Sequence, residues 1–150
     1  MNEDFIDLLR SLLKEDARFL VVGAHAMAAH GVPRATGDID IWVPADEGNA
    51  VQVFRALARF GAPLSSLGIS IADLAAPKNV VQIGLPPRRI DVLTSITGVD
   101  FEAAWNRRVF FTFSDLRVPV LSRDDLIANK RAAARPKDLA DVAVLDAGSR

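Results

Sequence analysis

Residues 19–43 read FLVVGAHAMAAHGVPRATGDIDIWV, and this stretch decides the fold. Phe19–Val22 is a short run of apolar residues that favour strands; it stops at Gly23, and strong helix formers follow. The sequence therefore predicts a buried strand that turns sharply into a short helix over residues 24–29. Residues 38–43 alternate polar and apolar with a period of two, which predicts a second strand with one apolar face.

Amphipathic helices are expected on both sides of this stretch. Residues 3–15 carry apolar side chains with the i, i+3, i+4, i+7 spacing of a packing helix. Asp46 is expected to cap a helix that runs to about Phe60 and stops at Gly61, because aspartate favours helix starts and glycine favours helix ends. Residues 62–70 are predicted to form a loop.

The next segments predict a short helix and a hairpin. Ser70 and Asp73 have the spacing of a capping box, which indicates a short turn of helix. Residues 80–83 and 89–93 read as strands. Because the connection between them is short, we expect these two strands to pair as an antiparallel hairpin.

More strands and a pair of helices are expected toward the C-terminus. Residues 100–107 predict a helix, and residues 109–113 and 118–121 predict two short strands around a polar turn. Ser122 repeats the capping-box spacing at the head of a helix through Ala134.

A last helix is predicted from Pro136, because proline suits the first position of a helix, where no N–H is needed. The residues predicted to form its core face are Leu139, Val142, Ala143 and Leu145. The last few residues are expected to fray. We therefore expect an α/β (α+β) fold, in which helices flank a mixed sheet and a helix pair ends the chain, as one domain over residues 1–150.

Composition excludes several classes of protein. The chain has 150 residues, of which 50% are hydrophobic and 25% charged, which excludes a disordered chain. The absence of cysteine excludes thiol catalysis, disulfides and cysteine-based zinc clusters. A net charge of -1 argues against a constitutively basic coat for nucleic acid. With no apolar run of ~18 residues and no basic leader at the start, we expect a cytoplasmic protein that does not contact a membrane.

Three aspartates are candidates for a metal site. Asp38 and Asp40 stand two apart on a strand, so both carboxylates project from the same face. Such a pair requires a neutralising cation, and rigid oxygen ligands suit magnesium. Asp91 is a third isolated carboxylate on an apolar strand. If the two strands are neighbours, the three acids can hold two divalent ions, as phosphoryl or nucleotidyl transfer requires. The alternative is a solvated polar face.

Gly23 also has two interpretations. It stands between a buried strand and a helix, where exposed backbone N–H groups can receive a phosphate. It can equally be a tight turn without a ligand.

Three segments of the chain carry a resemblance to known proteins: LVVGAH at residues 20–25, RATGDIDI at residues 34–41 and RIDV at residues 89–92. They resemble the motifs of the nucleotidyltransferase superfamily that includes DNA polymerase beta. The resemblance is closest to the small bacterial toxins of AbiE-type abortive-infection systems. There a lysine and an Arg-x-Lys-Asp tail are typical, and Lys130 and residues 135–138 match them.

The resemblance implies an activity and its ligands. It implies that Asp38, Asp40 and Asp91 are catalytic and bind magnesium, as two ions when a nucleoside triphosphate such as ATP is bound. A nucleoside monophosphate would then be transferred to a hydroxyl. The partners implied are a nucleoside triphosphate, an RNA, protein or small-molecule acceptor, and an antitoxin.

The resemblance also implies a nucleotide-binding set. Gly23, with Ala24 and His25 beside it, would contact the triphosphate, and Lys130 and Lys137 would neutralise phosphates. From the residues alone, both lysines are solvated helix charges, and His25 is a surface hydrogen-bond donor.

Two residues of the loop before the acidic strand stay open between two roles. Arg34 and Thr36 either contact phosphate or tie down this loop.

Ala24 departs from the superfamily pattern, which usually has serine or a second glycine there, so the side chain offers no hydroxyl to a phosphate. Three functions therefore stay open: a magnesium-dependent nucleotidyltransferase, a nucleotide-binding module with weak or no activity, and a structural or interaction protein.

Overall fold

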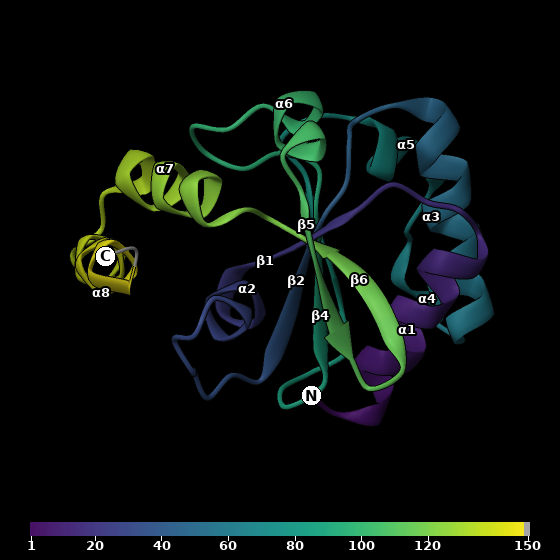
Figure 1. Ribbon diagram of the computed structural model, residues 1–150. Coiled ribbons are helices and arrows are strands. Elements are labelled where there is room, and N and C mark those ends of the chain that lie inside the picture. Colours follow the sequence, from purple (N-terminus) through teal and green to yellow (C-terminus); the bar gives the residue numbers. More distant parts are fainter. Residues whose placement is uncertain (149–150) are drawn as a thin grey trace.

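The computed structural model describes residues 1–148, and within them one six-stranded sheet has the order β3-β4-β2-β1-β6-β5 (Figure 1). The strands are β1 (Leu20–Val22), β2 (Asp38–Trp42), β3 (Val80–Ile83), β4 (Arg89–Leu93), β5 (Val109–Phe113) and β6 (Leu116–Val120). The helices are α1 (Glu3–Lys14), α2 (Gly23–Ala29), α3 (Glu47–Phe60), α4 (Leu64–Leu67), α5 (Ile71–Ala75), α6 (Phe101–Asn106), α7 (Arg123–Ala133) and α8 (Pro136–Gly148). The expectation of a frayed end lies partly outside the described residues.

The sheet is mixed, as predicted. β1 pairs antiparallel with β2 and parallel with β6, and β3 and β4 form the expected antiparallel hairpin. β2 and β4 pair in parallel, so the two strands that carry the acids are direct neighbours although α3 to β3 separate them in the chain.

Helices cover both faces of this sheet. α1, α3, α4 and α5 lie on one side, and α2, α7 and α8 lie on the other (Figure 1). The apolar residues of β2, Ile39 and Ile41, are buried in the core together with Phe5 and Leu9 of α1. Because apolar and acidic residues alternate along β2, burying one face leaves both acids on the opposite face.

Local signals set most of the boundaries of these elements. Asp46 accepts a hydrogen bond from the backbone of Asn49 at the start of α3, and Gly61 ends this helix with a φ of 101°. Ser70 and Asp73 form a complete capping box. Ser122 caps α7 through the backbone of Asp125. The predicted N-caps are therefore present, and the complete capping box occurs at Ser70.

Two predictions about helices are wrong. Residues 62–70 are not only a loop, because they include α4, whose Leu64 is buried in the core. In α8, Leu139 and Ala143 are exposed, and the buried face carries Asp138 and Asp141 beside two of the predicted apolar residues. Both acids have cationic partners: Asp141 pairs with Arg34 and Lys130, and Asp138 pairs with Arg135 just before the helix.

No helix among residues 1–148 has both the length and the hydropathy that spanning a membrane requires.

Candidate functional site

Three aspartates meet on one face of the sheet. The register of β2 and β4 places Asp40 beside Asp91 and Asp38 beside Arg89. Each aspartate offers a carboxylate oxygen, and these oxygens all lie within 4.8 Å of one another. We call Asp38, Asp40 and Asp91 the acid cluster. Oxygen ligands at this spacing can share a divalent cation.

Arg89 belongs to this site and was missed by the sequence analysis. Its Nη2 donates to Oδ2 of Asp38 at 2.5 Å and lies 3.3 Å from Oδ2 of Asp91. The signal was present in the sequence, because Arg89 stands two residues before Asp91 on the same strand and therefore shares its face.

The two acids of β2 have opposite pKa shifts. Burial raises the pKa of Asp38, but hydrogen bonds from Thr36 and Arg89 outweigh this effect and hold the pKa below its ordinary value. Burial, together with the neighbouring charges of Asp38 and Asp91, raises the pKa of Asp40 to about 7. The acid cluster is therefore short of positive charge at Asp40.

Gly23 is required by the geometry of this site. Its φ of +67° lies in the left-handed region, and a Cβ built there would be 2.2 Å from Oδ2 of Asp40. No side chain fits where the carboxylate of Asp40 already lies. Gly23 therefore forms the tight turn that both interpretations share, and its contact with a phosphate stays a prediction.

A cavity of about 290 Å³ lies beside the acid cluster. Asp38 and Asp40 line it from the sheet, and Gly23 and Ala24 line it from the start of α2. Its cationic lining residues are Arg34, Lys130, Arg135 and Lys137. His25, which was predicted beside them, is not among its lining residues.

The buried acids of α8 hold three of these cations. Asp141 accepts hydrogen bonds from Arg34 and from Nζ of Lys130, the latter at 2.9 Å. Asp138 accepts from Nε of Arg135 at 2.6 Å. We call these five residues the helix network. The side chain of Lys130 is only 13% exposed, so the interpretation of Lys130 as a solvated helix charge is wrong. Lys137 is exposed.

The acids of the helix network have lowered pKa values. A hydrogen bond from Arg135 is the main cause for Asp138. Burial raises the pKa of Asp141, but hydrogen bonds from Lys130 and Arg34 outweigh it. Both carboxylates are thus stabilised in their charged form.

Thr36 and His25 have structural contacts. The hydroxyl of Thr36 donates to Oδ1 of Asp38 at 2.7 Å, so Thr36 ties the loop to the acid that it precedes. His25 packs edge-on against Phe5, with ring centroids 5.6 Å apart, and burial lowers its pKa. Because its Nε2 is buried without a hydrogen-bond partner, the prediction of a surface donor is wrong.

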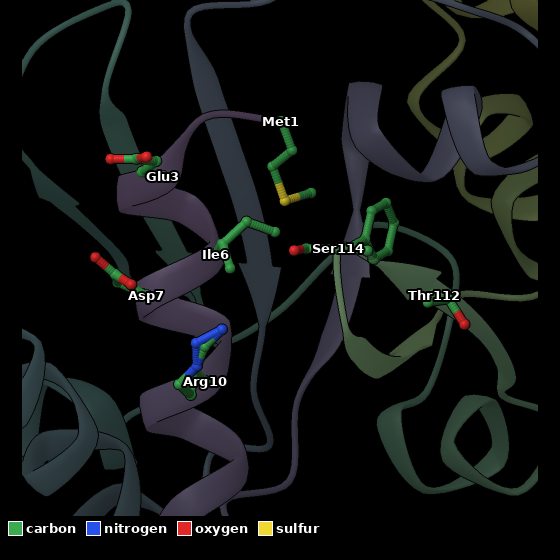
Figure 2. A pocket seen from close by; sticks show the side chains of 8 residues that line it. Met1, Glu3, Ile6, Asp7, Arg10, Thr112 and Ser114 are labelled. Atoms are coloured by element: carbon green, nitrogen blue, oxygen red, sulfur yellow. The ribbon is translucent and has the colours of Figure 1, made fainter.

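Two further cavities help to define the site. One of about 560 Å³ shares Gly23, Asp40 and Lys130 with the cationic cavity and adds uncharged residues such as Ile96 and Asn129. Another of about 620 Å³ lies between α1 and the β5–β6 hairpin and is shown in Figure 2. Residues of the acid cluster do not line it, so we do not assign the chemistry to it.

The model of a family described as "Nucleotidyltransferase of unknown function (DUF6036)" matches residues 3–146. A search of curated proteins gave no significant match.

Two solved structures are similar in fold. One is TM1012 of Thermotoga maritima, described as a candidate nucleotidyltransferase; it is 17% identical, the match covers 98% of this chain and 93% of that chain, and the TM-score is 0.58. The other is ANT(2")-Ia in complex with adenylyl-2"-tobramycin, at 13% identity, 97% and 87% coverage and a TM-score of 0.60. At these identities the likeness shows the fold, and closeness to AbiE-type toxins stays a prediction.

Proposed function

This chain belongs to the family of nucleotidyltransferases of unknown function (DUF6036), and from this premise we propose that it transfers a nucleoside monophosphate to a hydroxyl with the help of Mg²⁺. The observation that carries the proposal is the convergence of Asp38, Asp40 and Asp91 within 4.8 Å beside a cationic cavity. A metal site and a phosphate site side by side are what this chemistry needs.

The residues of the acid cluster fit a divalent cation. All three ligands are hard carboxylate oxygens, which suit Mg²⁺. Oδ1 of Asp91 is buried and lacks a hydrogen-bond partner, so it has an unused lone pair inside the site. When bound, divalent ions supply charge neutralisation at the phosphates and activate the attacking hydroxyl.

The protein residues around the cluster orient it. Thr36 fixes Asp38 through its hydroxyl, and Gly23 leaves the space that the carboxylate of Asp40 occupies. Carboxylates held in this way need little rearrangement to bind a cation, which favours catalysis.

We assign the cavity of about 290 Å³ to the triphosphate. Four cationic side chains line it, and Asp138 and Asp141 hold three of them in place. Lys137 adds an exposed charge at the same cavity. Ordered cations bind phosphate oxygens by charge-assisted hydrogen bonds. The cavity of about 560 Å³ opens beside Asp40 and Lys130 and gives the second substrate room to approach.

The acceptor is proposed as a hydroxyl of RNA, protein or a small molecule. An adenylylated small molecule is present in the ANT(2")-Ia structure, which is a precedent for the last class on this fold. A role as a cytoplasmic toxin with an antitoxin partner is part of the same proposal and rests on the resemblance of Lys130 and residues 135–138.

A transfer assay tests this function. The protein is incubated with each labelled nucleoside triphosphate, Mg²⁺ and a cell extract, which is then separated into RNA, protein and small molecules. We expect label in one fraction, and no label when Mg²⁺ is chelated or when Asp40→Asn is used. Absence of label in every fraction, or equal labelling by Asp40→Asn, would overturn the proposal.

A nucleotide-binding module with weak or no turnover is the second candidate, and Ala24 favours it. Ala24 lines the triphosphate cavity but has no hydroxyl to donate. Isothermal titration with a triphosphate, run beside the transfer assay, separates the two functions. Binding without transfer would favour the module.

A further inference from the structure

Arg89 lies where it balances two of the three acids. It faces Asp38 across the β2–β4 ladder and precedes Asp91 by two residues on β4. One nitrogen, Nη2, reaches both carboxylates, at 2.5 Å from Asp38 and 3.3 Å from Asp91. The positive charge therefore lies against two of the three carboxylates that a divalent cation would use.

The contact of Arg89 differs from those of two other arginines in this protein. Arg135 uses Nε and Nη2 on Asp138, and Arg107 uses the same two atoms on Asp125. Both pairs have the two-pronged geometry of a stable arginine–carboxylate pair. Arg89 uses Nη2 alone on its acids, and its Nε is buried without a hydrogen-bond partner.

The acids are also incompletely satisfied by this arginine. Oδ1 of Asp91 is buried and lacks a partner, and the hydrogen bonds of Arg89 go to Asp38 and Asp91, not to Asp40. One guanidinium supplies a single positive charge to three carboxylates. A divalent cation would supply more charge to the same carboxylates, so the cation and the guanidinium compete for them.

The guanidinium of Arg89 can move away from the acid cluster into solvent. Its side chain is 32% exposed, whereas the side chain of Asp91 is 10% exposed. A long, partly exposed side chain can move its charged end into water while the buried carboxylate stays in place.

We propose that Arg89 is a built-in counter-ion of the acid cluster, and that a divalent cation displaces its guanidinium from Asp38 and Asp91. This inference rests on the proposed function, because it assumes a metal at these acids. Without metal, the charge of Arg89 reduces the repulsion among the three carboxylates. The same charge weakens the binding of a metal ion. The side chain thus sets the metal concentration at which the site fills.

Metal titration without nucleotide tests the proposal. Mn²⁺ binding to the wild-type protein, Arg89→Gln and Arg88→Gln is followed by electron paramagnetic resonance of the free ion. Arg88→Gln is the matched control, because Arg88 is the adjacent arginine, is 54% exposed and pairs with Asp4 of α1. We expect Arg89→Gln to bind Mn²⁺ roughly tenfold more tightly, because a competing charge is removed, and the control to match the wild type.

Thermal unfolding provides a second measurement. Without metal, Arg89→Gln should melt below the wild type, and Mn²⁺ should raise its melting temperature more than that of the wild type. If Arg89→Gln folds only with metal present, the result supports the proposal, because metal then replaces the lost charge.

The outcomes separate this inference from the proposed function. Equal or weaker Mn²⁺ binding by Arg89→Gln overturns the role of Arg89 and leaves the metal site standing. Absence of Mn²⁺ binding in both proteins overturns the inference together with the metal part of the proposed function, and the transfer assay then decides the rest.

Discussion

Two clusters of charged residues border the same cavity, one with an excess of carboxylates and the other with an excess of cations. The acid cluster has three carboxylates and one nearby guanidinium, from Arg89. The helix network has two carboxylates and three cations, Arg34, Lys130 and Arg135. The same residue type, aspartate, therefore lies in two different electrostatic environments.

The difference appears in the pKa values. Burial and two neighbouring carboxylates raise the pKa of Asp40 to about 7, whereas hydrogen bonds from cations hold the pKa values of Asp138 and Asp141 below the ordinary range. A cluster with too many acids can take up a cation, and a cluster with paired acids can hold cations in place for an anion. The comparison thus assigns binding of metal to one cluster and positioning of phosphate-binding groups to the other.

The largest effect is expected on transfer. Asp91→Asn removes a proposed metal ligand. Loss of a residue that only supports a metal ligand costs roughly 10- to 100-fold in activity, so we expect Asp91→Asn to lower kcat by more than this. Asp141→Asn should act mainly on KM for the triphosphate, by about tenfold, because Arg34 and Lys130 lose their anchor. Steady-state kinetics measure both effects. Asp115→Asn, in a largely exposed ion pair with Arg10, is the control.

The assignment to two roles fails if Asp91→Asn keeps its kcat, or if Asp141→Asn lowers kcat as far as Asp91→Asn does.

The next largest effect is expected on the free energy of unfolding, where substitutions in the two clusters should act in opposite directions. Without metal, Asp40→Asn should leave stability unchanged or raise it, because one of three repelling carboxylates becomes neutral. Asp141→Asn should lower it by roughly 2–4 kcal/mol, because the partly buried cations Arg34 and Lys130 lose a buried partner. Urea unfolding of both variants checks this expectation. A similar loss in both would show that Asp40 satisfies buried donors and that the contrast between the clusters is wrong.

The pH dependence of stability should separate the clusters further. Folding raises the pKa of Asp40 to about 7, so the folded protein favours the protonated form of this acid. The stability that Asp40 contributes is fully present below about pH 3.8 and is lost as the pH rises through about 7. Folding lowers the pKa values of Asp138 and Asp141, so the folded protein favours their charged forms. The stability that these two acids contribute is present above about pH 3.8 and is lost as the pH falls below that value. Urea unfolding of the metal-free protein from pH 3 to 8 measures both arms.

In Asp40→Asn, the free energy of unfolding should no longer fall as the pH rises above about 4, because the group with the raised pKa is gone. The loss of stability at acid pH should remain, because Asp138 and Asp141 are unchanged. An unchanged neutral arm in this variant would contradict the pKa assigned to Asp40.

The smallest effect concerns Ala24, which lines the cationic cavity. Ala24→Ser adds a hydroxyl that can donate to a charged phosphate oxygen, and a hydrogen bond of this kind corresponds to about tenfold in affinity. We expect tighter binding of the triphosphate and little change for the monophosphate in isothermal titration. Equal effects on both nucleotides would place the triphosphate elsewhere.

The contributions of local and long-range signals differ between the two clusters. The period of two along β2 was sufficient to predict that Asp38 and Asp40 share a face, and the isolation of Asp91 suggested a third ligand. In α8 the same reasoning was only half right, because Val142 and Leu145 are buried as predicted but Leu139 and Ala143 are exposed. Asp138 and Asp141 are also buried, and the cationic partners of Asp141 come from other elements, which a local pattern does not show.

What the sequence by itself determined is most of the elements, all but α4, together with their caps and the side of each strand on which a carboxylate stands. These features depend on spacing within a few residues and on short-range hydrogen bonds such as that from Asn49 to Asp46. Only the tertiary structure decided which charges meet. Arg89 is 51 residues from Asp38 in the chain, and Asp141 is 107 residues from Arg34. Such pairs follow from the strand order and from the packing of α8, which local patterns do not encode.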